Sequence, residues 1–301
     1  MTDLQIRLFA FDWIKKQTEI HGDVLPRKLL HDGFNISGEN YGLVGPQGIW
    51  KPKSMQLPIS ITSIIDGPYP DSIDEGSGIL NYRYRGTNPN HRDNAGLREL
   101  MKYKIPLIYL HNIAENKYVP MWPVYIVADN PATLSFSVMA DDIAYIQTAE
   151  QSEQAAESLT SYARRAYITV TSLRRVHQRG FRETVLKAYR NQCALCRLRH
   201  PELLDAAHII GDLEDNGEPI IQNGLSLCKI HHVAYDQNII GINPDYNIKV
   251  RKDILEEIDG PMLKYGLQSL DNALLILPKH EGDYPDKERL DYRYNQFLKA
   301  G

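Results

Sequence analysis

The three cysteines of this 301-residue chain lie in one stretch and constrain its fold more than any other feature. Cys193 and Cys196 are separated by two residues, and Cys228 and His231 form a second pair with the same spacing. Two such pairs can supply the four nitrogen and sulfur ligands of a closed tetrahedral zinc site. If the cysteines were merely reduced and buried, this matched spacing would be a coincidence. We therefore predict a structural Zn²⁺ bound by these four residues.

An odd number of clustered cysteines argues against a disulfide framework and favours a reducing compartment. No apolar run approaches the roughly 20 residues that a membrane span requires. Residues 1–16 mix charged side chains into their apolar pattern, which is unlike a signal peptide. We therefore expect a cytoplasmic protein with no membrane partner.

The net charge of −4 opposes binding to a polyanion, but the charges are unevenly distributed. Residues 164–199 contain ten Lys or Arg side chains and a single acid, Glu183. A local basic block on an acidic chain suits a confined phosphate-binding face. The alternative is an ordinary solvated helix with a charged surface.

The N-terminal half changes its pattern along the chain. Residues 3–19 have the apolar spacing of an amphipathic helix, and a shorter helix is expected at 26–33. From about residue 42 to 138, short β-like runs broken by Gly, Pro, Asn and Asp indicate a small barrel or a strongly curved sheet. The expected strands are 59–65, 78–84, 107–110, 122–127 and 134–138, with one helix at 94–103.

Three motifs in this region resemble the SRA (SET and RING associated) domain, a PUA-like barrel. They are Gly45-Pro46-Gln47-Gly48-Ile49, then residues 69–76, and then Tyr84-Arg85-Gly86-Thr87. SRA domains flip a modified cytosine out of duplex DNA. A base that leaves the stack must regain the lost energy through stacking and edge hydrogen bonds. The resemblance therefore implies a reader of modified cytosine.

Transferred position by position, the resemblance implies that Tyr69 and Tyr84 sandwich the flipped base. Asp71 and Ser72 lie where its Watson–Crick edge would be read, with Ser72 at the position that is an acid in the family. Arg85 lies beside Tyr84 and is expected to contact DNA, since Arg interleaved with aromatic residues suits nucleic acid. The alternative is that both tyrosines are ordinary half-buried residues of a turn and a strand.

Residues 146–170 are interpreted as a linker between domains at 1–145 and 171–301. A strand is expected at 167–171, followed by a basic helix that buries Phe181, Val185, Leu186 and Tyr189. Farther along, the sequence predicts a hairpin at 239–250, a strand at 274–277 and a terminal helix after Pro285. The inward residues of that last helix are expected to be Leu290, Tyr294, Phe297 and Leu298.

A second set of metal-handling residues is interleaved with the zinc pairs. His208, Asn223 and His232 occur in that order, and Asp236 follows His232 at the i+4 position, where both side chains share one helical face. This arrangement resembles the HNH (ββα-metal) endonucleases, in particular bacterial zinc-knuckle restriction enzymes. The resemblance extends over about residues 178–251.

The resemblance implies a role for each of these side chains. His208 would be the general base, and Asn223 would brace the hairpin through hydrogen bonds to backbone. His232 and Asp236 would bind the catalytic ion. Asp205 is a further candidate ligand, although alternation along the strand directs it away from His208.

Two neighbouring positions qualify this assignment. Ala207 stands where many family members have a metal-binding Asp or His directly before the base. The consecutive histidines would serve different metals, with His231 on the structural zinc and His232 on the catalytic ion.

Phosphodiester hydrolysis needs a deprotonated water in line with the scissile bond and a cation on the phosphate oxygens. A neutral imidazole is a suitable base near neutral pH. Mg²⁺ is the expected ion, and Mn²⁺, Ni²⁺ and Co²⁺ are compatible with a histidine ligand. The predicted fold is α+β with two domains, a PUA/SRA-like curved β-barrel with flanking helices and a zinc-stapled ββα-metal HNH domain.

Together the resemblances imply a bacterial restriction endonuclease that acts on double-stranded DNA carrying 5-methyl- or hydroxymethylcytosine. A homodimer is expected, because one ββα site handles one strand. Two alternatives stay open. One is an HNH endonuclease of unmodified sequence, and the other is a DNA-binding zinc module whose nuclease is inactive, as Ala207 would allow.

Overall fold

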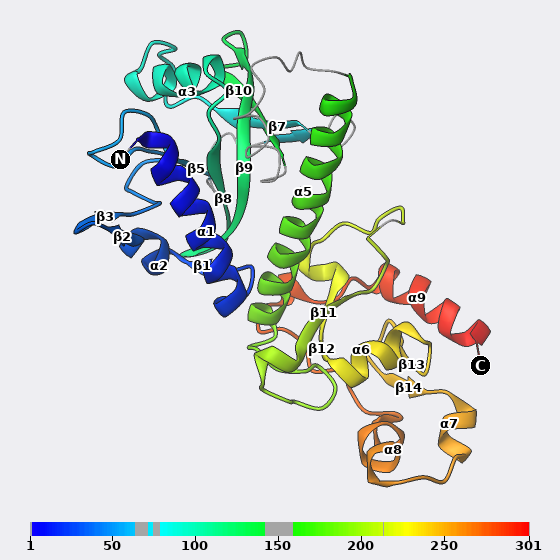
Figure 1. The fold of residues 1–301 in the computed structure, drawn as a ribbon. Coiled ribbons are helices and arrows are strands. Elements are labelled where there is room, and N and C mark those ends of the chain that lie inside the picture. The colour runs from blue at the N-terminus through cyan, green and yellow to red at the C-terminus, as the bar shows by residue number, and fades with distance from the viewer. Residues whose placement is uncertain (1, 64–71, 75–78, 142–158, 213, 301) are drawn as a thin grey trace. The chain divides into compact units, whose positions relative to one another are not determined.

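The computed structural model describes residues 2–63, 72–74, 79–141, 159–212 and 214–300 (Figure 1). The chain divides into two compact units, Met1–Arg179 and Gly180–Gly301, which we call the N-terminal unit and the C-terminal unit. The division lies inside helix α5 (Leu159–Ala188), beyond the predicted linker at 146–170.

The N-terminal unit alternates short strands with three helices ahead of α5, within the part of the chain described. Its elements are α1 (Asp3–His21), β1 (Leu25–Pro26), α2 (Arg27–Asp32), β2 (Phe34–Ile36), β3 (Glu39–Tyr41), β4 (Ile49–Trp50), β5 (Ser60–Thr62), β6 (Ser72–Asp74), β7 (Ile79–Arg83), α3 (Arg92–Lys102), β8 (Leu107–Ala114), β9 (Lys117–Asn130) and β10 (Ser135–Ala140). The predicted helices and strands of this region are therefore confirmed, with boundaries that differ by a few residues.

Eight of these strands form one sheet in the order β4-β5-β8-β9-β10-β7-β6, with β1 paired to β9 outside this path. Neighbouring strands are antiparallel except β5 and β8, which are parallel. Register shifts interrupt the β8/β9 and β9/β10 pairings, and such irregularities bend a sheet. The expected curved sheet is confirmed, whereas its PUA-like arrangement stays a prediction.

Successive side chains of β8 point to opposite faces of the sheet, and each face has its own helix. Tyr109 packs in a buried cluster with Leu97 of α3. Its neighbour Ile108 packs in a different cluster with Phe11 of α1. Helices α1 and α3 therefore cover opposite faces of the same sheet.

Helix α1 is attached to the sheet by a buried cation. The Arg7 guanidinium is fully buried and donates to the carbonyl oxygens of Pro106 (3.1 Å) and Leu57 (3.3 Å). Burial lowers the pKa of Arg7 to about 10, so the side chain stays charged at neutral pH. The helix begins with a capping box in which Thr2 and Gln5 exchange hydrogen bonds.

The strand predicted at 167–171 is wrong, because these residues lie within α5. The β-branched run Ile168-Thr169-Val170 favours a strand locally, but tertiary contacts outweigh that preference. Thr169 is buried, and its hydroxyl donates to the Arg165 carbonyl one turn earlier (2.7 Å) and accepts from the Ala140 amide (2.7 Å). The helical conformation thus gives the Thr169 hydroxyl both of its hydrogen bonds, although the sequence pattern predicts a strand here.

The C-terminal unit begins within the last turns of α5. Its elements are η1 (Pro201–Leu203), β11 (Leu204–His208), η2 (Ile221–Asn223), β12 (Gly224–Cys228), α6 (Lys229–Asp236), β13 (Ile240–Ile242), β14 (Ile248–Val250), α7 (Lys252–Glu256), α8 (Pro261–Gly266), η3 (Gln268–Leu270), η4 (Glu281–Asp283) and α9 (Lys287–Ala300). The predicted hairpin at 239–250 is confirmed as β13 and β14, which pair antiparallel. No helix among the described residues is long and apolar enough to cross a membrane.

The core of this unit confirms most of the predicted inward residues. The face of α5 predicted to be apolar is buried, as are Leu290 and Phe297 of α9. Leu298 is 56% exposed, so its predicted inward position is wrong. The strand predicted at 274–277 is also wrong in extent, because Leu274 makes only an isolated bridge to Asn247.

The packing of α9 on β13 generates a stability prediction. A Cβ atom at Gly241 would lie 2.5 Å from the Phe297 ring, so Gly241→Ala should destabilise this unit by about 1–3 kcal/mol through overpacking. Urea unfolding followed by circular dichroism would measure the change. Gly260→Ala is the matched control, because the space around its Cβ is open and its φ is −65°. Equal stability of the two variants would contradict the prediction.

Candidate functional site

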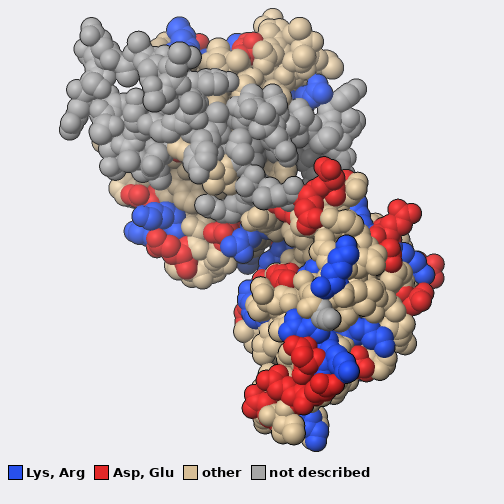
Figure 2. Space-filling model, turned by 90° about the vertical axis from the view of Figure 1, so that its right-hand side faces the viewer, with Lys and Arg blue, Asp and Glu red and all other residues tan. Residues whose placement is uncertain are grey.

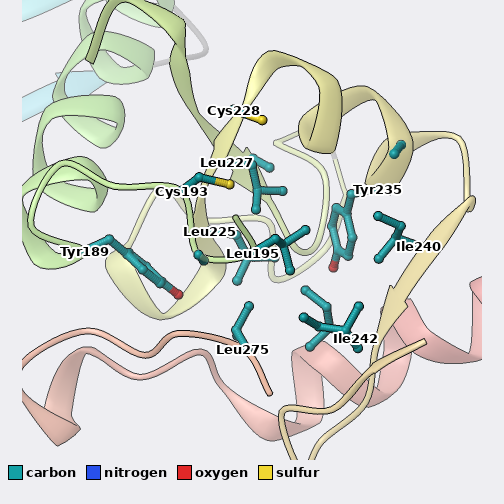
Figure 3. Close-up of a cluster of buried hydrophobic side chains, with 14 of the residues drawn as sticks. Tyr189, Cys193, Leu195, Leu225, Leu227, Cys228, Tyr235, Ile240, Ile242 and Leu275 are labelled. Carbon is teal, nitrogen blue, oxygen red and sulfur yellow. The ribbon is translucent and has the colours of Figure 1, made fainter. Parts of the chain in front are cut away.

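The predicted zinc ligands converge. One ligand atom from each of Cys193, Cys196, Cys228 and His231 lies within 4.8 Å of all the others. Nδ1 of His231 is 3.4 Å from the Cys193 sulfur and 3.2 Å from the Cys228 sulfur. Three thiol groups and one imidazole nitrogen at this spacing fit a tetrahedral Zn²⁺ site. Figure 3 shows the Cys193 and Cys228 sulfur atoms at one edge of a cluster of buried hydrophobic side chains.

The hydrogen bond on the far side of the His231 ring fixes which nitrogen can bind a metal. Nε2 lies 2.7 Å from the Gly266 carbonyl oxygen, which can only accept, so Nε2 carries the proton. Nδ1 faces the cysteines and is therefore the nitrogen that can bind a metal once it is deprotonated. This is the usual way in which an outer hydrogen bond orients a metal-binding histidine.

The cysteine environment favours a thiolate at Cys228. Hydrogen bonds from Cys193 and Cys196 and the nearby His231 imidazole hold the pKa of the Cys228 thiol well below its usual range. Cys228 is also the N-cap of α6, where the helix dipole stabilises negative charge. A thiolate is the form that binds zinc.

A hairpin and the helix that follows it carry the other candidate residues. Strands β11 and β12 pair antiparallel, with His208 opposite Gly224 and Leu204 opposite Cys228. Helix α6 starts at the next residue after β12. The local fold is therefore β-β-α, in agreement with the expected ββα arrangement.

Asn223 braces the loop between the two strands. It is fully buried, its Oδ1 accepts from the Ile210 amide (2.9 Å), and its Nδ2 donates to the carbonyl oxygens of Ile210 (3.0 Å) and Glu218 (3.1 Å). The Asn223 carbonyl also accepts from the Ile209 amide (2.9 Å). The amide side chain thus replaces strand pairing where the chain leaves β11, directly after His208.

His208 has the environment of a neutral base. Its ring stacks on Phe181 with 4.1 Å between centroids, and within the described residues its buried Nε2 has no hydrogen-bond partner. Burial lowers the pKa of His208 below its ordinary value of 6.5; Asp212 and Asp236 raise it, and His232 lowers it further. The imidazole is therefore neutral at pH 7, with a nitrogen able to accept a proton.

Gly224 makes room for the helix that contacts this base. Gly224 lies in β12 with an extended φ of −127°, so its backbone conformation does not require a glycine. A Cβ there would lie 2.4 Å from Cγ2 of Val185 and 2.9 Å from the Phe181 ring. The absence of a side chain lets α5 approach the hairpin closely, and this approach places Phe181 on His208.

The two consecutive histidines of α6 face different partners. His231 is buried against the cysteines, whereas His232 is half-buried and lies between two carboxylates. His232 Nδ1 is 3.5 Å from Asp205, and its Nε2 is 3.3 Å from Asp236. Asp205, which alternation directs away from His208, reaches the α6 histidine instead.

Two basic side chains surround Asp205, and the sequence reasoning missed both. Lys229 Nζ is 2.5 Å from Asp205, and the Arg182 guanidinium is 3.8 Å away. Burial alone would raise the pKa of Asp205, but the hydrogen bond and charge of Lys229, with help from His232, hold it below its usual value. The signal available in the sequence was the position of Lys229 at the first turn of α6, two residues after Leu227, which pairs with Asp205.

The His208, His232 and Asp236 side chains do not form a second closed metal cluster. In the described part of the chain, the Cys₃His group is the one set of three or more potential ligands that all lie within 4.8 Å of one another. A more open arrangement suits Mg²⁺, which keeps several waters and binds phosphate oxygens alongside few protein ligands.

Part of the basic block reaches the surface. Lys187, Arg190, Arg197 and Arg199 are exposed around the end of α5 and the Cys193–Cys196 knuckle. Arg182 is engaged internally, because it donates to the carbonyl oxygens of Pro201 and Leu204 at its own unit's hairpin. On the face drawn in Figure 2, the C-terminal unit has Lys and Arg interspersed with Asp and Glu.

The N-terminal unit contains a hollow of about 330 Å³ at two of the SRA-like motifs. Its lining residues are Pro46, Gln47, Gly48, Ile49, Thr62, Tyr82, Arg83, Tyr84, Arg85 and Gly86. Tyr69 and Asp71 lie outside the described residues. Ser72 belongs to β6, where its backbone pairs with Asn81.

Two of the predicted reader residues are held by protein contacts. Tyr84 is buried, packs against Phe136 with 4.7 Å between the centroids of the tilted rings, and donates its hydroxyl to Asp129. Arg85 donates to the side chains of Gln47 and Asp93. The Arg85–Gln47 contact fixes the amide of Gln47 at the wall of the hollow.

Comparison with known proteins identifies the catalytic segment. Residues 193–243 match the sequence model of the HNH endonuclease family, so this stretch of the C-terminal unit is an HNH nuclease domain. No curated protein matches the chain. One solved structure that matches is described as a modification dependent TagI restriction endonuclease, with 16% identity over 80% of this chain and 82% of that chain. The TM-score is 0.29, which does not establish a shared fold.

Loss of a zinc ligand should abolish metal binding and unfold the nuclease domain. Purified wild-type protein is expected to contain a single zinc ion per chain, and Cys228→Ser should contain none, because a structural site supplies folding energy. Plasma mass spectrometry and near-ultraviolet circular dichroism would measure both effects. Ser269→Ala, which removes a hydroxyl bonded only to a local carbonyl, is the control. Full zinc content in Cys228→Ser would exclude this ligand.

Proposed function

We propose that the HNH domain makes this protein a DNA endonuclease in which His208 is the general base. The observation that carries the proposal is the neutral, Phe181-stacked His208 imidazole with an unpartnered Nε2 among the described residues. It lies in the segment that matches the HNH family. Hydrolysis of a phosphodiester needs a base that is unprotonated at the working pH and that can reach a bound water.

The reaction follows from the residues around this base. His208 would accept a proton from a water, the resulting hydroxide would attack the phosphorus, and the 3′ oxygen would leave and take a proton from solvent water. The products are a 5′-phosphate and a 3′-hydroxyl. His232 and Asp236, with Asp205 beside His232, would hold a divalent cation, which would supply stabilisation of the charge that develops on the phosphate oxygens.

Asn223 and Phe181 act on the base indirectly. The Asn223 side chain fixes the backbone just after His208 through Ile210. Phe181 covers one face of the imidazole, which restricts the ring to one plane and removes water from that face. Both contacts keep the acceptor nitrogen in place, and accurate placement accounts for much of enzymatic rate enhancement.

We further propose that the N-terminal unit selects DNA with a modified cytosine. Support comes from the hollow of about 330 Å³, because it is lined by residues of two motifs that resemble the SRA domain. Tyr84 would form a fixed wall of this pocket with Arg85 beside it, and the roles proposed for Tyr69, Asp71 and Ser72 rest on the resemblance alone. A flipped base bound here would be held by stacking and by hydrogen bonds to its edge.

Each HNH domain offers a single ββα site, so a double-strand break requires two chains on one duplex. We therefore propose a homodimer on DNA. An inactive, DNA-binding zinc module is the second candidate, because Ala207 is fully buried and supplies no ligand before the base.

Replacement of His208 tests the catalytic proposal. His208→Ala should lower the rate of plasmid nicking in Mg²⁺ or Mn²⁺ by at least about 100-fold, because general-base catalysis is lost. Supercoiled, nicked and linear plasmid separated on agarose gels would give the rates. The matched control is His200→Ala, which removes an exposed histidine paired only with Glu202. Cleavage that survives in His208→Ala removes this residue as base, and an inactive wild type favours the binding module.

Matched substrates test the specificity proposal. Duplexes of the same sequence with cytosine, 5-methylcytosine or 5-hydroxymethylcytosine should be cut at different rates, with the unmodified duplex slowest, because the reader gains affinity only from the modified base. Initial cleavage rates at low enzyme concentration would show the preference. Equal cutting of all three duplexes would leave an HNH endonuclease of unmodified sequence as the better description.

A further inference from the structure

One face of the C-terminal helix α9 contacts both sides of the candidate site. Arg289, Tyr292 and Arg293 are spaced i, i+3 and i+4, so their side chains project from the same face. We call these three residues the α9 clamp. The helix starts at Lys287, well beyond the 193–243 segment that matches the HNH family.

Arg293 binds the end of the helix that carries His232 and Asp236. Its Nη2 donates to the carbonyl oxygens of Tyr235 (2.7 Å) and Asp236 (3.3 Å), and its guanidinium lies 5.0 Å from the centroid of the Tyr235 ring. The last carbonyls of a helix have no partners within the helix, and a cation there also complements the helix dipole. Arg293 therefore fixes the turn of α6 from which the Asp236 carboxylate projects.

Arg289 and Tyr292 bind the loop that separates His208 from Asn223. Arg289 donates to the Asn216 carbonyl (2.6 Å) and to the Glu218 carboxylate (2.7 Å). Tyr292 donates to the Glu214 carboxylate (3.0 Å). The same Glu218 uses its backbone carbonyl to accept from the Asn223 side chain (3.1 Å), so the clamp and the asparagine hold one loop from two sides.

The clamp is distinct from the contacts that attach α9 to the domain. Leu290 and Phe297 are buried and anchor the helix in the core, with Phe297 packed over Gly241 of β13. Of the clamp residues, Arg289 and Arg293 are half-buried and Tyr292 is 49% exposed. Their removal should leave the helix attached while the two segments that it joins become free to move apart.

We propose that the α9 clamp positions α6 relative to the loop after His208, and that Arg293 is its principal positioning residue. The proposal rests on the assignment of His208, His232 and Asp236 to catalysis. It differs from a stability role in one respect. Misplacement lowers the rate constant of each folded molecule, whereas destabilisation lowers the fraction of molecules that react.

Single-turnover cleavage separates these two effects. Arg293→Gln should reduce the cleavage rate constant by about 10- to 100-fold with the reaction amplitude unchanged, because small errors of placement have large effects on rate. DNA affinity without added Mg²⁺ or Mn²⁺, measured by fluorescence anisotropy, should stay at the wild-type value. Lys299→Gln removes a positive charge from an exposed site on the same helix and should match the wild type.

Two milder variants keep the test informative if Arg293→Gln folds poorly. Arg293→Lys retains a cation that can donate to the α6 carbonyls and should recover part of the rate. Tyr292→Phe removes one hydroxyl from the loop contact and should reduce the rate constant by less than Arg293→Gln does. Both retain most of the packing of the helix.

The proposal is overturned if Arg293→Gln cleaves as fast as Lys299→Gln. It is also overturned if the amplitude falls and the rate constant does not. A wild-type protein that fails to cleave any substrate would overturn the catalytic assignment, and the clamp's role would fall with it. An active wild type with an unaffected Arg293→Gln removes the positioning role alone.

Discussion

Successive residues of an α-helix project about 100° apart, and this constraint organises the whole C-terminal unit. His231 and His232 cannot share a direction, so the first joins the cysteine cluster while the second lies between Asp205 and Asp236. One short helix thereby connects a site that holds the domain together with a site suited to chemistry. The hairpin before α6 supplies a cysteine to the first site and His208 near the second.

The features that the sequence revealed are those encoded by short, repeated spacing. Matched pairs of cysteine and histidine predicted the four-ligand cluster, and the i and i+4 positions predicted the shared face of His232 and Asp236. Helix and strand positions in the N-terminal unit followed from apolar periodicity. The resemblance to HNH endonucleases, carried by His208, Asn223 and His232, implied the β-β-α segment, and the family model matches the same stretch.

The features that the sequence did not reveal depend on contacts between distant segments, which leave no periodic signal. Gly224 has a turn-like sequence context, yet its function is to admit Val185 and Phe181 from a helix that ends far earlier in the chain. Thr169 belongs to a strand-like run, yet its hydroxyl is satisfied only in a helix. The hydrogen bonds from α9 to α6 and to the loop after His208 likewise cannot be predicted from the local sequence, because the charged residues of α9 have the pattern of any solvated helix.

The hydrogen bond between His231 and Gly266 connects metal content to the surface of the domain. It joins a zinc ligand to α8, and α8 carries Met262 and Tyr265, which are 61% and 70% exposed. Of the two neutral tautomers, only the one with its proton on Nε2 can donate to the Gly266 carbonyl and bind a metal through Nδ1, so metal binding and the attachment of α8 favour the same proton position. The rate of proteolysis near Met262 is therefore expected to depend on whether the metal site is occupied.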